Sequence, residues 1–392
     1  MAGEQGISRI VVKIGSAVLA DRWGRISEKR VGALVGQFAE VSMRGIDIAI
    51  VSSGAIAAGM GRMEMKQRPD DITTLQAAAA VGQGILMQTY SELFSNEGVT
   101  VAQVLLTQAD LNHRQRYLNA RRTLEKLFEM RVVPVINEND TVAIEEITFG
   151  DNDLLAALVA GLIKADMFVL LTDTGGLYTA DPRRSDRARL IKRVDVIDES
   201  VRALAGEAGT DVATGGMSSK IEAVAAATSA GVDSVIADGR KGRAVMSILD
   251  GRKVGTYFPA TGSATSRKHW IGYAKKSAGM IVLDAGAVNA VASRGKSVLA
   301  AGVVGVEGDF HVDDCLDIVD ENGQLIGRGL SSYDAEEARK VMGMCSQKAR
   351  EVLGEKPEPL VHRDSMMVYK EKPGLIAGSA ARQRKRRKDE RG

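Results

Sequence analysis

The sequence has few aromatic residues, little proline and only two cysteines, and each scarcity excludes a class of protein. Aromatic residues make up 4% of the 392 residues, which leaves few platforms for stacking nucleic-acid bases. Seven prolines do not make a low-complexity chain, so the 42 glycines indicate tight turns and close backbone approaches. Cys315 and Cys345 exclude a disulfide-rich scaffold and a zinc site built from cysteines.

Long apolar runs are missing as well. The longest spans ten residues, 154–163, and ends at Lys164, whereas a helix needs about 20 apolar residues to cross a bilayer. No basic segment followed by an apolar stretch opens the chain in the manner of a signal peptide. With 45% hydrophobic residues, the chain has enough apolar surface for large cores, and we expect a cytoplasmic protein of two or three domains.

Positive charge is concentrated at the C-terminal end. The formal net charge is +2, and the last eleven residues, 382–392, carry seven arginines and lysines against two acidic residues. That segment has a net charge of +5, so the other residues sum to −3. The overall positive charge comes from this tail, so it says little about the charge of the active site in the mildly acidic body.

Short apolar runs alternate with amphipathic segments over roughly the first 258 residues. The runs are typical of strands buried on both faces, and they lie at 9–14, 46–51, 101–106, 132–136, 167–171 and 234–237. Helical periodicity is found at 27–44, 75–94, 118–130, 153–163 and 221–230. This alternation predicts an α/β fold, a three-layer αβα sandwich around a mainly parallel sheet.

The pattern changes after Pro259. We expect a first domain at 1–259, a linker at 260–276, and a small β-rich, mixed or barrel-like domain at 277–356. One helix is expected in this domain, at about 334–344, with strands at 281–283, 303–306, 315–319 and 325–328. Residues 357–392 hold three of the seven prolines and the basic run, and we expect a poorly ordered basic tail there.

Glycines and hydroxyl residues recur directly after the predicted strands. Ligands of parallel α/β sheets bind at the carboxyl ends of the strands, and glycine-rich loops that lead into helices suit phosphate. The segments at strand ends are 13–16, 52–55, 137–140 and 172–176, and two further segments of the same kind lie at 150–153 and 214–220. Any one of them would be an ordinary turn, but several together, with lysines in two, indicate phosphate chemistry. The four histidines show no metal-ligand spacing.

Six blocks carry a resemblance to one enzyme family: VVKIGSAVL, IVSSGAIAAGM, VVPVINENDTV, GDNDLLAALVAG, LLTDTGGLYTADPR and ATGGMSSK. In this order, over residues 11–220, they resemble the amino acid kinase family, and specifically its members that phosphorylate glutamate. The segment at about 277–354 resembles the PUA domain that many of these members carry. One departure is Ala17, because the family usually has two hydroxyl residues after Gly15.

The resemblance implies transfer of the γ-phosphoryl group of ATP, with Mg²⁺, to the side-chain carboxylate of L-glutamate, the first step of proline biosynthesis. A glutamate carboxyl has a pKa of about 4.3, so the nucleophile is ionised at neutral pH and needs no general base. It needs positioning, and cations that offset repulsion between a carboxylate and a triphosphate. The resemblance further implies inhibition by proline, a homo-oligomer (dimer or tetramer), and transfer of the unstable product to a glutamyl phosphate reductase.

The resemblance also assigns roles to residues. Lys13 and Lys220 are implied to stabilise negative charge on the transferred group, and Asp153 to hold both lysines. Glutamate is implied to bind to Ser53, Asp140 and Asn152. Nucleotide contacts are implied for Lys13, Gly15, Ser16, Thr172, Asp173, Thr214, Gly215, Gly216, Met217, Ser218, Ser219 and Lys220. The Asp140 carboxylate is an acceptor suited to an α-ammonium group. We assign no protein ligand to Mg²⁺.

Two other interpretations stay open. The first is another member of the family, an acetylglutamate or aspartate kinase; acetylglutamate has no free ammonium, so Asp140 would have no cationic partner. The second, from a different class, is an RNA-binding protein, suggested by the PUA-like segment and the basic tail. The scarcity of aromatic residues and the acidic body argue against RNA binding.

Overall fold

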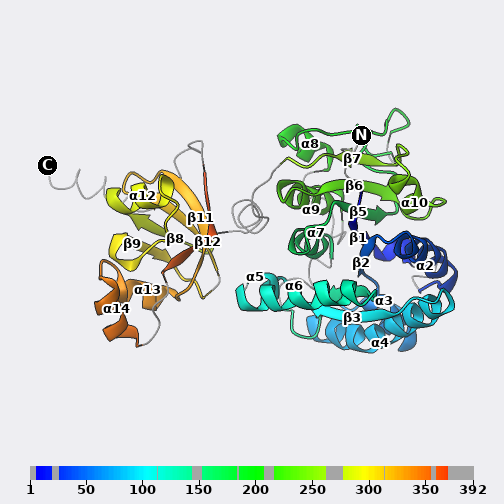
Figure 1. Ribbon diagram of the computed structural model, residues 1–392, viewed down its shortest axis with the longest axis horizontal. Coiled ribbons are helices and arrows are strands. Elements are labelled where there is room, and N and C mark those ends of the chain that lie inside the picture. The colour runs from blue at the N-terminus through cyan, green and yellow to red at the C-terminus, as the bar shows by residue number, and fades with distance from the viewer. Residues whose placement is uncertain are drawn as a thin grey trace. The chain divides into compact units, whose positions relative to one another are not determined.

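The chain divides into two compact units, residues 1–266 and 267–392. The computed structural model describes residues 6–19, 26–112, 114–143, 152–182, 185–206, 216–261, 277–312, 314–354 and 359–369. In Figure 1 the first unit runs from blue to green and the second from yellow to red. Within the described residues no helix is long and apolar enough to span a membrane.

A seven-stranded sheet forms the centre of the first unit. Its strands are β1 (Arg9–Ile14), β2 (Asp47–Ser52), β3 (Val101–Leu106), β4 (Val133–Glu138), β5 (Met167–Thr172), β6 (Asp233–Asp238) and β7 (Thr256–Phe258). The spatial order is β3-β4-β2-β1-β5-β6-β7. Neighbouring strands are parallel except at the edge, where β7 runs antiparallel to β6. The expected mainly parallel sheet is confirmed, and β7 is the strand that the sequence patterns did not indicate.

Helices cover both faces of this sheet. They are α1 (Ser16–Leu19), α2 (Glu28–Met43), α3 (Ala55–Arg62), α4 (Ile72–Asn96), α5 (Gln108–Asn112), α6 (Arg114–Glu129), α7 (Asn152–Leu162), α8 (Glu199–Leu204), α9 (Met217–Ser229) and α10 (Ala244–Leu249). One core joins α2, α4 and α10 to the sheet, and a second core joins α6, α7 and α9 to the opposite face. The three-layer architecture is therefore confirmed.

Strand alternation decides which face each side chain of β1 meets. Ile10, Val12 and Ile14 lie in the core with α2 and α4, whereas Val11 lies in the core with α7 and α9. Because successive side chains point to opposite faces, Lys13 shares the face of Val11. A charged side chain on a central strand is thereby aimed at the beginnings of α7 and α9.

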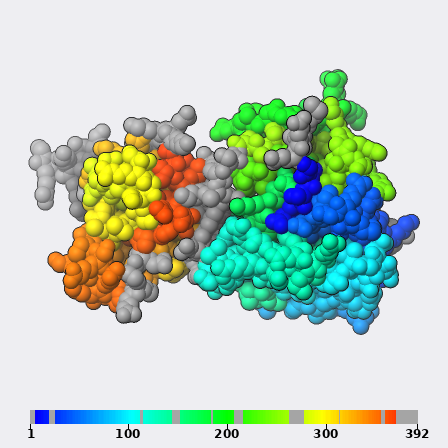
Figure 2. All heavy atoms as spheres, in the orientation of Figure 1, coloured from blue at the N-terminus to red at the C-terminus, as the bar shows by residue number. Residues whose placement is uncertain are grey.

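Helices α3 and α4 cross at two glycines, Gly59 and Gly82. A Cβ atom on Gly59 would lie 1.8 Å from the carbonyl oxygen of Ala78, and one on Gly82 would lie 1.8 Å from that of Ala55. Only glycine allows this approach, because no side chain fits between the two backbones. The cyan segments, which include α4, gather along one side of the first unit (Figure 2).

The second unit contains a five-stranded mixed sheet. The strands are β8 (Gly279–Leu283), β9 (Val303–Gly308), β10 (Cys315–Asp320), β11 (Leu325–Ser331) and β12 (Val361–Val368), in the order β12-β11-β10-β8-β9. Strands β8 and β10 are parallel, and the other neighbours are antiparallel. The expected small mixed β domain is confirmed. Its α-helices among the described residues are α12 (Ala285–Ala292), α13 (Ala335–Val341) and α14 (Ser346–Leu353), of which only α13 was expected.

The expectation of a poorly ordered tail from residue 357 is wrong for residues 361–368. These residues form β12, which pairs with β11 and buries Val361 and Met366 in the core of the second unit. The prolines at 357 and 359 precede the strand. Proline has no N–H to donate to a neighbouring strand, so it would weaken β12 only if it lay within it. The rest of the expected tail, from residue 370 onward, lies outside the described residues.

Candidate active site

Within the described part of the chain, the predicted site residues lie at the carboxyl ends of β1, β2, β4 and β5 and at the beginnings of α7 and α9. The chain leaves β1 toward β2 on one side, while β5 leads to β6 on the other side. Such a reversal of direction is where doubly wound sheets bind their ligands. The loop after β1 stays close to β5, because the backbone N–H of Gly15 donates to the carbonyl of Leu171 at 3.0 Å.

Two lysines meet on one carboxylate at this point. The Nζ atom of Lys13, from β1, is paired with Oδ1 of Asp153. The Nζ atom of Lys220, from the first turns of α9, donates to Oδ2 of Asp153 at 3.1 Å. The residues are 3%, 6% and 0% exposed for Lys13, Lys220 and Asp153. The structure thus brings together the three residues that the family resemblance assigns to phosphoryl transfer.

Burial of three charged groups is not explained by stability alone. Removing charges from water costs several kcal/mol per ion, and a buried ion pair regains this only with close geometry. Buried and paired charges at the carboxyl end of a parallel sheet are typical of functional sites. The beginnings of α7 and α9 lie beside the cluster and add the positive ends of two helix dipoles, which favour an anion.

A chain of side-chain amides lies next to the lysine cluster. Asn152, the residue before Asp153, donates from Nδ2 to Oδ1 of Asn137 at 2.7 Å. The same Nδ2 lies 3.1 Å from the carbonyl oxygen of Ser52 and 3.3 Å from the hydroxyl of Ser53. Of the three residues predicted to bind glutamate, the structure therefore joins Ser53 and Asn152 directly.

Asp140, the third predicted glutamate residue, follows β4 and is half-buried. Asn137 lies in the same INEND segment but was given no role from the sequence, although its side chain is 3% exposed and central to the amide chain. Gln83 of α4 accepts from Nδ2 of Asn137 at 2.8 Å. No motif points to Gln83, because its helix shows only the periodicity of a core helix.

The residues predicted to bind the nucleotide lie at the end of β1, at the end of β5 and around the start of α9. The hydroxyl of Thr172 donates to Asp173 at 3.2 Å, and the N–H of Gly239 donates to the carbonyl of Thr172 at 2.9 Å. Gly216 is the residue before α9, and the helix begins with Met217, Ser218 and Ser219. Ser16 is exposed at the first position of α1. Thr214 and Gly215 lie outside the described residues.

Asp238 and Arg240 are further residues on this side that the sequence did not single out. Arg240 donates to the backbone carbonyl of Asp173 and, from Nε, to Oδ1 of Asp238 at 3.2 Å. Burial opposes ionisation of Asp238, but hydrogen bonds and charge from Arg240 outweigh it and hold the pKa of the carboxyl below its ordinary value. The pair thereby ties the Thr172–Asp173 turn to the end of β6.

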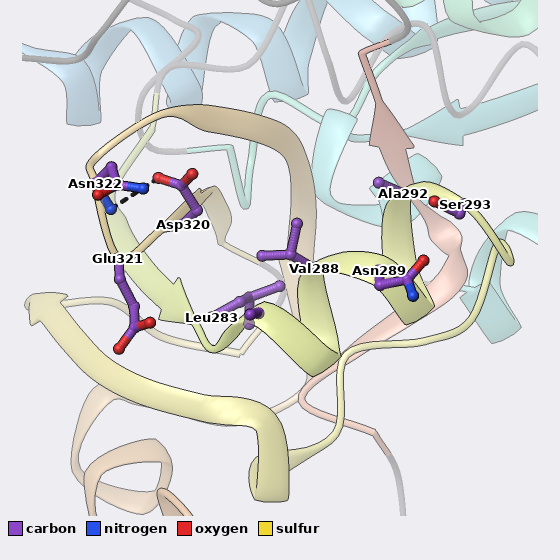
Figure 3. Close-up of a pocket in the computed structure, with 9 residues that line it drawn as sticks. Leu283, Val288, Asn289, Ala292, Ser293, Asp320, Glu321 and Asn322 are labelled. Atoms are coloured by element: carbon purple, nitrogen blue, oxygen red, sulfur yellow. Dashed lines mark hydrogen bonds between the residues drawn. The ribbon is translucent and has the colours of Figure 1, made fainter.

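A cavity of about 360 Å³ lies in the second unit, between α12 and the turn after β10 (Figure 3). Asp320, one of its two acidic lining residues, accepts hydrogen bonds from the backbone N–H groups of Asn322 and Gln324. These bonds are those of an ordinary Asp-stabilised turn. The cavity contains none of the predicted site residues. The described residues hold no group of three or more His, Cys, Asp and Glu side chains placed to bind a metal ion.

Comparison with known proteins agrees with this architecture. Residues 8–238 match the amino acid kinase family, and residues 279–353 match the PUA domain. The chain therefore belongs to the amino acid kinase family, with a PUA domain following the kinase fold.

Curated relatives place the chain more narrowly. A glutamate 5-kinase of Moorella thermoacetica is 46% identical over 362 residues, which cover 92% of this chain and 96% of the relative. A glutamate 5-kinase of Chromohalobacter salexigens is also 46% identical, over 92% of this chain and 96% of the relative. One of Synechococcus elongatus is 44% identical over 92% of this chain and 99% of the relative. Within the family, the chain groups with the glutamate 5-kinases over nearly its whole length.

Proposed function

We propose that this chain transfers the γ-phosphoryl group of ATP to the side-chain carboxylate of L-glutamate and forms glutamate 5-phosphate. The observation that carries the proposal is the convergence of Lys13 and Lys220 on buried Asp153, directly beside the amides of Asn152 and Asn137. Cations and hydrogen-bond donors lie side by side, as a reaction between two anions requires. The 42–46% identity to relatives named glutamate 5-kinase supports glutamate as the acceptor.

In this proposal the order of the strands separates the two substrates. Glutamate binds over β2 and β4, where Ser53, Asn152 and Asp140 lie, and the nucleotide binds over β5 and β6. The lysines lie between them, at β1 and the start of α9, where the phosphoryl group passes from one substrate to the other. Holding both reactants in line accounts for much of the rate enhancement in such a transfer.

Each charged residue then has one task. The attacking carboxylate is already ionised at neutral pH, so no proton is removed from it. The ammonium groups of Lys13 and Lys220 donate to phosphoryl oxygens as negative charge shifts toward the leaving group. Asp153 keeps both ammonium groups at the same point, so little reorganisation is needed when the reaction begins. Mg²⁺ accompanies ATP, and its chemistry is to neutralise phosphate charge; we assign it no protein ligand.

A hydroxylamine-trapping assay tests the proposal, because an acyl phosphate reacts with hydroxylamine to give a coloured hydroxamate. The chain is incubated with ATP, Mg²⁺ and L-glutamate, and separately with acetylglutamate or aspartate. We expect product from glutamate alone. Product from acetylglutamate or aspartate and none from glutamate would favour the other kinases of the family. RNA binding is not favoured, since the relatives cover the full kinase and PUA regions under a kinase name.

We further propose the associations that accompany this activity. They are inhibition by proline, assembly into a homo-oligomer, location in the cytoplasm, and delivery of the product to a glutamyl phosphate reductase. An acyl phosphate hydrolyses readily, so rapid transfer to a reductase is chemically reasonable. The same trapping assay with added proline measures the inhibition, and sedimentation of the full chain measures the assembly.

Asp140→Ala is expected to raise the KM for glutamate at least about 10-fold and to change the KM for ATP less than about 2-fold. The carboxylate is the acceptor proposed for the α-ammonium group, and a hydrogen bond between charged groups is worth about 1.5–3 kcal/mol. Steady-state kinetics with each substrate varied in turn measures both constants. Asp195→Ala, at an exposed carboxylate, is the control. Equal changes in both KM values would mean that Asp140 organises the site as a whole.

A chain that ends at residue 266 is expected to fold and to keep its turnover within about 5-fold. All residues assigned to catalysis and binding lie at or before Lys220, inside the first compact unit, and a unit with its own cores can fold alone. Circular dichroism measures folding, and the trapping assay measures activity. A folded but inactive fragment would mean that the PUA domain completes the site.

A further inference from the structure

A buried hydrogen-bond donor beside the proposed glutamate site has no partner among the described residues. It is the side-chain amide nitrogen, Nε2, of Gln83 in α4. The oxygen of the same amide is occupied, since it accepts from Asn137 at 2.8 Å. Buried polar groups in proteins are nearly always satisfied, so such a donor calls for an explanation.

The orientation of the Gln83 amide follows from a fixed point in the network. Nδ2 of Asn152 lies 3.1 Å from the backbone carbonyl of Ser52, and a carbonyl can only accept, so this atom must be the nitrogen. Asn152 then donates to Oδ1 of Asn137, which leaves Nδ2 of Asn137 to donate to Gln83. The oxygen of Gln83 must therefore face Asn137, and its nitrogen must face away.

Flipping the Gln83 amide would bring two donors together, its own NH2 and that of Asn137. The carbonyl of Ser52 therefore fixes the amide orientations of Asn152 and Asn137, and these in turn leave the N–H donor of Gln83 facing away from Asn137. The unsatisfied donor is a consequence of the whole network and is not a local accident. What would satisfy it is an acceptor brought by a ligand.

We infer that Gln83 donates a hydrogen bond to the α-carboxylate of the amino acid substrate and thereby helps to select a dicarboxylate. This inference rests on the proposed function, since it takes glutamate as the substrate. A carboxylate oxygen is a strong acceptor, and a donor without another partner discriminates sharply against substrates that lack it.

The order of the elements indicates which of the two carboxylates meets Gln83. The γ-carboxylate must approach the lysines at β1, because it attacks the phosphoryl group there. Asn137, which holds Gln83, belongs to β4, and β2 separates β4 from β1 in the sheet. Asp140 follows the same strand β4 and is the proposed acceptor for the α-ammonium group. The amino acid end of the substrate thus lies at β4, with Asp140 for its positive group and Gln83 for its negative group.

Two variants separate a contact with substrate from support of Asn137. Gln83→Glu keeps an oxygen that accepts from Asn137 but removes the donor and places a negative charge before the α-carboxylate. Gln83→Leu removes both functions. Gln88→Leu is the matched control, because Gln88 lies in the same helix, is exposed and contacts only Glu92 by hydrogen bond among the described residues.

The experiment measures the KM for glutamate, kcat, and the inhibition constant of 4-aminobutyrate, which is glutamate without its α-carboxylate. We expect Gln83→Glu and Gln83→Leu to raise the KM for glutamate about 10- to 100-fold, with kcat within about 3-fold. The inhibition constant of 4-aminobutyrate should change less than about 3-fold, and Gln88→Leu should change nothing.

Two results would overturn the inference. An unchanged KM in Gln83→Glu would mean that only the oxygen facing Asn137 matters. If the KM for glutamate and the inhibition constant of 4-aminobutyrate rose by the same factor, the substitutions would disturb the site as a whole and not a contact with the α-carboxylate. Failure of the proposed function gives a different result: the unaltered chain would then form no hydroxamate from glutamate and ATP in the trapping assay.

Discussion

Replacing Lys220 with alanine is expected to lower kcat at least about 100-fold, and Lys13→Ala should have an effect of the same size. Removal of one preorganised donor at a site of developing charge costs about 10²–10³ in rate. Both ammonium groups lie on Asp153 in surroundings that are less than a tenth exposed, so water cannot replace the lost charge readily. The measurement is kcat at saturating ATP, Mg²⁺ and glutamate.

The charge balance of the cluster indicates that either lysine variant can fold. Each substitution leaves one lysine to pair with Asp153, so the carboxylate keeps a cationic partner. Asp153→Ala differs, because it leaves two ammonium groups close together, and breaking a buried pair costs about 3–5 kcal/mol. The lysine variants are therefore the cleaner test of chemistry.

Lys126→Ala, at a lysine 68% exposed in α6, is the control for the lysine variants, and thermal melting checks that each one is folded. A folded Lys13→Ala or Lys220→Ala variant with unchanged kcat would remove that lysine from the mechanism.

Gly82→Ala is expected to destabilise the first unit by about 3 kcal/mol or more. The new methyl group would meet the carbonyl oxygen of Ala55 at 1.8 Å, and a backbone atom cannot move aside as a side chain can. Helices α3 and α4 would have to separate, and overpacking of this kind costs about 1–3 kcal/mol even when neighbours can shift. Urea denaturation followed by circular dichroism measures the change.

Gly84→Ala is the control for this prediction, two residues along the same helix. A Cβ atom there meets nothing within 4 Å, so alanine should stabilise the helix by up to about 1 kcal/mol. The two substitutions are chemically identical and differ only in what faces the new methyl group. Equal free energies of unfolding for the two variants would show that the close crossing of α3 and α4 is not required.

The crossing also affects the site, because it holds elements that meet the substrate. Helix α3 begins directly after Ser53 and Gly54, and Gln83 follows Gly82 in α4. Tyr90, further along α4 and fully buried, lies 2.9 Å from the hydroxyl of Ser52. Burial raises the pKa of Tyr90 far above its ordinary value, so this contact stays uncharged at physiological pH. A separation of α3 and α4 should therefore raise the KM for glutamate as well as lower stability.

The sequence predicted most of the first unit because its periodicity is local. The apolar positions of α2 recur at helical spacing and are buried as expected, among them Val31, Leu34 and Phe38. The six predicted strands are short apolar runs between such helices, and all six are present. In the second unit, β12 was missed because prolines and a nearby basic run suggested disorder, while the pairing that orders it comes from β11. That pairing is not visible in the strand's own residues.

By itself, the sequence indicated that Lys13, Ser53 and Asp140 would lie at the carboxyl edge of a parallel sheet, because each ends or follows a buried strand. Asp153 and Lys220 were joined to them by the family resemblance, since both lie at the beginnings of helices. The tertiary structure alone decided which of them touch. Asp153 and Lys220 are 67 residues apart, and Gln83 and Asn137 are 54 apart, yet each pair is within hydrogen-bond distance. Contacts of this kind depend on strand order and on the glycine crossing of α3 and α4, which bring separate helices to one point. Local periodicity carries no information about that order, so the proposed contact of Gln83 with the substrate could be inferred only from the folded structure.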